Sequence, residues 1–60
     1  MKTAKQPDPS TADRVEYVTA RELRQRGSWA AALWAPIIER QGWYSYTEHP
    51  SGTKVLLIAK

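Results

Sequence analysis

The chain has 60 residues, no cysteine, one histidine and a formal net charge of +3 at pH 7. Disulfides and thiolate metal sites are therefore excluded, and the single histidine cannot build a zinc site alone. A chain of this length is expected to form one domain that buries only about 60% of the surface exposed on unfolding. The three Trp and three Tyr residues are the side chains best able to enlarge so small a core.

Residues 1–13 are polar, and two prolines occur within them, in the segment PDP. Because they lack apolar side chains, we predict a disordered N-terminal tail followed by a folded domain over residues 14–60. The tail has no apolar stretch typical of a signal peptide, and no segment approaches the roughly 20 apolar residues of a membrane helix. These features favour a cytoplasmic protein.

The first expected elements are a strand over residues 14–18 and a short helix that follows it. Thr19 and Glu22 match the capping box, in which the threonine accepts a hydrogen bond from the amide three residues on. Gly27 suits the left-handed end of this helix. Ser28 can cap a second helix, which we expect to run to Gly42.

The second helix has two halves when its residues are placed at 100° intervals. We expect the half rich in large apolar residues to face the core; it contains Trp29, Ala30, Leu33, Trp34, Ile37 and Ile38. The other half is expected to be exposed; it contains Ala31, Ala32, Ala35, Pro36 and Glu39. Pro36 lacks an amide donor, so a kink or a restart of the helix is expected there.

The residues that follow the second helix predict a β-hairpin. Residues 43–47 alternate, residues 48–53 contain the proline and glycine of a turn, and residues 54–59 are apolar on both faces, as in a central strand. Depending on register, Tyr44 and Tyr46 share a face either with Leu56 and Ile58 or with Val55 and Leu57.

The order strand, helix, helix, hairpin resembles a minimal winged helix-turn-helix domain. The segments that carry the resemblance are TARELRQRGS and ERQGWYSYTEHPSGTKVLLIA. The resemblance implies an α+β fold, β-α-α-β-β, with a small three-stranded antiparallel sheet. It places the last strand between the other two, makes the second helix the recognition helix and makes the hairpin the wing. The usual additional N-terminal helix of that family is missing.

The resemblance also implies a regulatory or accessory module that binds double-stranded DNA without a cofactor. Arginines of the first helix, the start of the second helix and polar residues of the wing are the candidate contacts. They are Arg21, Arg24, Arg26, Ser28, His49, Ser51, Thr53 and Lys54. Against direct base readout, the expected exposed half of the second helix has no Arg, Lys, Asn or Gln.

The alternative is an adaptor that binds another protein, or a second copy of itself, through an apolar helix or sheet face. The candidate interface residues are Ala31, Ala35, Tyr44, Tyr46, Leu56 and Ile58. A homodimer through the outer sheet face, centred on Leu56 or Ile58, would cover apolar surface that so short a chain cannot cover itself. The sequence contains no catalytic grouping, so we expect no enzymatic activity.

Overall fold

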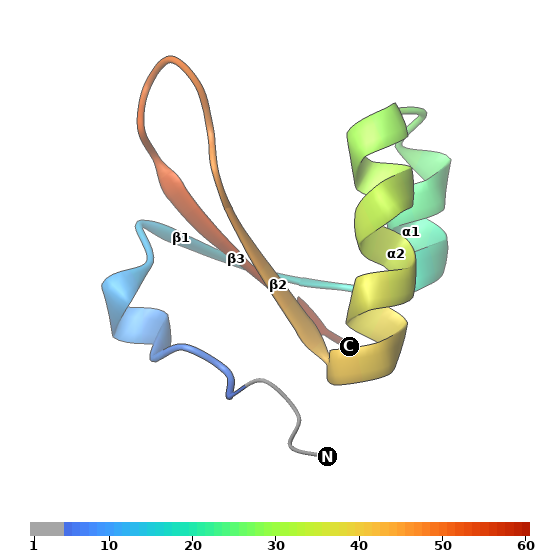
Figure 1. Ribbon diagram of the computed structural model, residues 1–60, viewed down its shortest axis with the longest axis horizontal. Coiled ribbons are helices and arrows are strands. Elements are labelled where there is room, and N and C mark those ends of the chain that lie inside the picture. The colour runs from blue at the N-terminus through green and yellow to red at the C-terminus, as the bar shows by residue number, and fades with distance from the viewer. Residues whose placement is uncertain (1–4) are drawn as a thin grey trace.

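Two helices cover one face of a three-stranded sheet in the computed structural model, which describes residues 5–60 (Figure 1). The elements are a 3-10 turn at Pro9–Thr11, β1 at Arg14–Val18, α1 at Ala20–Gln25, α2 at Trp29–Gln41, β2 at Trp43–Thr47 and β3 at Lys54–Ala59. The predicted α+β class and the order β-α-α-β-β are confirmed.

The central position of β3 is also confirmed, because the strand order is β1-β3-β2. The expected all-antiparallel sheet is wrong, since β1 runs parallel to β3 while β2 runs antiparallel to it. After β1, the two helices bring the chain back to the end of the sheet at which β1 finishes, and β2 begins there. There Lys60 donates to the Val18 carbonyl and Ala59 donates to the Gly42 carbonyl, each at 2.9 Å. Consequently β2 runs opposite to β1. After the hairpin, β3 runs opposite to β2 and therefore parallel to β1.

Both helices begin and end at the residues that the local sequence indicates. The Thr19 hydroxyl accepts from the Glu22 amide at 3.1 Å, and the Ser28 hydroxyl accepts from the Ala31 amide at 3.4 Å. Gly42 ends α2 at a φ of 90°, a left-handed conformation that a residue with a Cβ rarely adopts. Of the two outcomes expected at Pro36, a restart of the helix does not occur, since α2 is one helix of 13 residues with Pro36 inside it.

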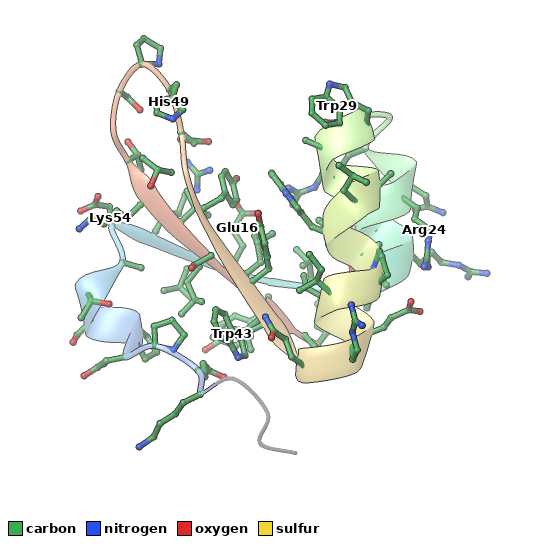
Figure 2. All side chains as sticks on the ribbon, viewed as in Figure 1. Glu16, Arg24, Trp29, Trp43, His49 and Lys54 are labelled. Carbon is green, nitrogen blue, oxygen red and sulfur yellow. The ribbon has the colours of Figure 1, made fainter. Side chains whose placement is uncertain are left out.

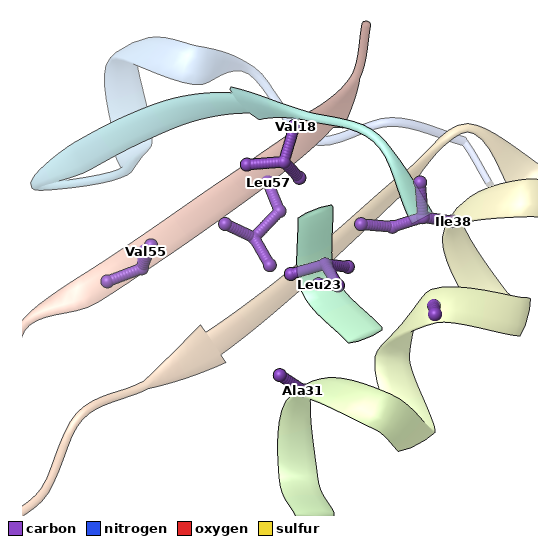
Figure 3. Packing of buried hydrophobic residues seen from close by; sticks show 7 residues of the cluster. Val18, Leu23, Ala31, Ile38, Val55 and Leu57 are labelled. Carbon is purple, nitrogen blue, oxygen red and sulfur yellow. The ribbon is translucent and has the colours of Figure 1, made fainter. Parts of the chain in front are cut away.

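The core lies between the helices and the sheet (Figure 3). It consists of Val18, Leu23, Ala31, Ala35, Ile38, Val55 and Leu57. The predicted orientation of α2 is correct for Ile38, which is buried, and for Ala32, Pro36 and Glu39, which are exposed. It is wrong for four residues: Ala31 and Ala35 are buried, whereas Trp29 is 79% exposed and Leu33 is 58% exposed. Because α2 packs against both α1 and the sheet, small side chains are needed where these elements approach it closely.

The opposite sheet face is covered in part by the chain's own N-terminal segment, which passes beneath the sheet in Figure 1. Within the segment predicted as a tail, Pro9–Thr11 form a 3-10 turn. Asp13 pairs with Lys54 through two hydrogen bonds, of 2.8 and 2.9 Å. Pro7, Thr11 and Ala12 line a cavity of about 190 Å³ against β2 and β3. Leu56, which lines the same cavity, is 1% exposed; residues 1–4 of the predicted tail lie outside the described residues.

Candidate interaction surfaces

The arginines predicted to contact DNA are exposed, but two of them are engaged with carboxylates. Nη2 of Arg24 lies 2.9 Å from Oε1 of Glu39, and Nη2 of Arg26 lies 2.8 Å from Oε1 of Glu16. Arg21 has no ion pair within residues 5–60. A phosphate would therefore have to compete with Glu39 and Glu16 for two of the three predicted cations.

The hairpin residues predicted for DNA lie on another part of the molecule. Figure 2 shows Arg24 and Lys54 at opposite ends of the long axis, with His49 on the hairpin loop. In the loop, the hydroxyls of Ser51 and Thr53 are hydrogen-bonded to each other at 3.0 Å. Ser28, between the helices, uses its hydroxyl as the α2 cap. The predicted DNA contacts are thus spread over separate surfaces.

A network of four charged side chains links β1 to the inter-helix turn and to the end of β2. Arg14 binds Glu16 at 3.0 Å and Glu48 at 2.8 Å, while Arg26 binds the second oxygen of Glu16 at 2.8 Å. The hydrogen bond from Arg26 and the attraction of both arginines hold the pKa of Glu16 below its usual value. The four side chains thus form a chain, Arg26–Glu16–Arg14–Glu48, in which Glu16 joins the two arginines.

We predict that Arg26→Gln raises the pKa of Glu16, because it removes the largest cause of the lowering. In the wild type the stabilisation by this pair is complete above the ordinary carboxyl pKa and is lost as pH falls through the lowered value. The effect on unfolding is a few tenths of a kcal/mol, since the pair is partly solvated. Carboxyl NMR titration measures the pKa. Arg21→Gln is the matched control, and an unchanged Glu16 pKa in Arg26→Gln would contradict the assignment.

A stripe of apolar side chains is exposed along α2. We call it the α2 stripe; it consists of Trp29, Ala32, Leu33 and Pro36, which are all exposed. Trp29 stands at the N-terminal end of α2 (Figure 2), and Arg40 continues the same side of the helix at its other end. The sequence analysis missed this surface because it assigned Trp29 and Leu33 to the core.

The predicted interface tyrosines face the helices rather than the outside. Tyr44 and Tyr46 share a sheet face with Leu57 and Val55, which decides between the two registers left open by the sequence. The ring of Trp34 stacks on both, with centroids 5.3 Å from Tyr44 and 4.3 Å from Tyr46. These half-buried rings extend the core toward the β2 edge. Ile58, on the other sheet face, is half-buried.

Within residues 5–60 no helix is long and apolar enough to cross a membrane, and no three His, Asp or Glu side chains are grouped as they would be around a metal ion. Comparisons of the chain with family models, with curated proteins and with solved structures found no match. The winged-helix resemblance therefore rests on element order alone and stays a prediction.

Proposed function

We propose that this protein is a non-enzymatic, cytoplasmic interaction module that binds a partner protein through the α2 stripe. The observation that carries the proposal is the exposure of two large apolar side chains one helical turn apart, Trp29 at 79% and Leu33 at 58%. Large apolar residues gathered on one side of a surface helix are typical of an interaction site. Tryptophan is also among the residues that contribute most to protein interfaces.

The α2 stripe has the spacing of a helix that docks in a groove. Trp29, Ala32, Leu33 and Pro36 are at positions i, i+3, i+4 and i+7, the pattern with which helices anchor in hydrophobic grooves. Arg40, at the end of the stripe, has no ion pair within residues 5–60. The partner that fits is therefore a protein with an apolar groove bordered at one end by carboxylates.

DNA binding, predicted from the winged-helix resemblance, is the competing function. The net charge of +3 and the exposed Arg21 favour it. The α2 stripe disfavours it, because Trp29, Ala32, Leu33 and Pro36 provide only one hydrogen-bonding group, the indole N–H of Trp29, for base edges on the predicted recognition helix. The observations thus favour a protein partner, and DNA becomes an outcome of the test.

The test uses the full chain as bait in a lysate of its source, followed by purification of each captured protein and direct titration. We expect at least one purified protein to bind the wild type. Trp29→Ala should weaken that binding by at least about 2 kcal/mol, or about 30-fold in Kd. Leu33→Ala should weaken it by a smaller factor, and Arg40→Gln should reduce its dependence on salt.

Tyr17→Ala is the matched control, because Tyr17 is an aromatic residue 60% exposed on β1, away from α2. Equal binding of the wild type and Trp29→Ala by every captured protein would refute the role of the α2 stripe. Duplex DNA is titrated in parallel at low salt. Tight binding that Arg21→Ala weakens and Trp29→Ala leaves unchanged would replace the proposal with the DNA-binding function.

A further inference from the structure

The backbone of β2 alternates between the sheet interior and an open edge. Glu48 donates to the Thr53 carbonyl at 2.8 Å and Ala59 donates to the Gly42 carbonyl at 2.9 Å. In an antiparallel ladder the residues bonded to the neighbouring strand alternate, so the even-numbered residues of β2 bond to β3. The amides and carbonyls of Trp43, Ser45 and Thr47 consequently point away from the sheet.

This edge lacks the features with which proteins usually protect a free strand. The segment WYSYT contains no charged residue and no proline, and its register with β3 is continuous, without a bulge. The other edge strand, β1, carries Arg14 and Glu16. Within residues 5–60 no hydrogen bond reaches the outward amides and carbonyls of Ser45 and Thr47. The β2 edge is thus the better template for pairing.

We propose that two copies of this chain pair through β2, antiparallel, with Ser45 opposite Ser45 of the second copy. Trp43 of each copy then lies opposite Thr47 of the other, and roughly six main-chain hydrogen bonds form, two for each of three opposed pairs. The two sheets become one continuous sheet of six strands. This interface does not use the α2 stripe, so it is independent of the proposed function.

The side chains of β2 suit this register. Ser45 is exposed and small, so two copies can lie side by side at the centre without a clash. On the helix-facing side, Tyr44 lies opposite Tyr46 of the second copy, and aromatic cross-strand pairs stabilise antiparallel sheets. The side chain of Gln41 donates to the Trp43 carbonyl at 2.8 Å. That carbonyl has a second lone pair for the amide of the opposed Thr47.

A register-specific cross-link tests the pairing, since the chain has no cysteine of its own. In the proposed register the two residues at position 45 have Cα atoms about 5.5 Å apart, within the range of a disulfide. Ser45→Cys should therefore form a disulfide-linked dimer rapidly under mild oxidation. Thr47→Cys, on the same edge and face, should not, because the two residues at position 47 are offset by about 14 Å.

Sedimentation equilibrium from micromolar to millimolar concentration tests the same interface without a covalent bond. The wild type and Ser45→Ala should reach the mass of two chains. Ser45→Pro removes an outward amide that β3 does not use, so its dimer Kd should rise at least tenfold. Circular dichroism checks that it folds; if it does not, the cysteine pair carries the test.

Three results would overturn the pairing. They are a wild-type mass of one chain throughout, cross-linking of Thr47→Cys as fast as that of Ser45→Cys, and an unchanged dimer Kd in folded Ser45→Pro. Leu33→Cys, on the α2 stripe, separates this proposal from self-association through α2. Rapid cross-linking there with none at position 45 would assign the dimer to the helix.

Discussion

Leu57→Ala is expected to lower the free energy of unfolding by about 2–5 kcal/mol, the largest effect that we predict for a single substitution. Leu57 is fully buried in the central strand and belongs to the cluster of residues between the sheet and the helices. Its truncation removes apolar contacts and leaves a cavity that the short flanking strands cannot close. Sixty residues correspond to a total stability of roughly 3–9 kcal/mol, so this loss is a large fraction of the whole.

Urea titration followed by circular dichroism measures this loss. Leu33→Ala is the matched control, because it is the same substitution at a leucine that is 58% exposed. Its free energy of unfolding should stay within about 0.5 kcal/mol of the wild type. Equal losses in the two variants would mean that Leu33 is packed as tightly as Leu57, which would contradict the orientation of α2.

Ala35→Leu is expected to cost about 1–3 kcal/mol because α2 has no room for a larger side chain there. Ala35 is fully buried and belongs to the core cluster. Three additional heavy atoms at this position must push α2 away from its neighbours or force a strained rotamer. Urea titration again gives the change in the free energy of unfolding.

Ala32→Leu provides the comparison on the same helix, three residues away on the exposed side. Alanine and leucine have similar helix propensities, so the stability of this variant should change little. A helix oriented as the sequence pattern indicates would leave Ala35 exposed, and Ala35→Leu would then be harmless. That result would reject the buried alanines and with them the exposed α2 stripe.

Where the helices start and where α2 ends could be predicted from the sequence, because these features depend on neighbouring residues. Thr19 and Ser28 each accept a hydrogen bond from an amide three residues on, and Gly42 supplies a left-handed conformation. The apolar character of β3 likewise predicted its central place. Both faces of that strand are covered, since Leu57 meets the helices and Leu56 lies beneath the N-terminal segment.

The candidate sites depended on contacts between residues far apart in the chain. The sequence pattern placed Trp29 and Leu33 in the core beside Ile38, but Ala31 and Ala35 are the residues that join Ile38 there. This packing turned Trp29 and Leu33 outward. The pairing of Arg24 with Glu39, fifteen residues away, likewise follows from how α1 lies against α2.

The sequence by itself determined the strands, the helices and their ends, because each is specified by residues within a few positions of one another. Only the tertiary structure decided which side of α2 is exposed, that β1 runs parallel to β3, and that Pro7, Thr11 and Ala12 line a cavity together with Leu56. The hydrophobic effect is non-directional and depends on the apolar area removed from water, so it does not by itself select which side of a helix is buried. The surface that stays apolar and exposed is therefore set by which elements pack together.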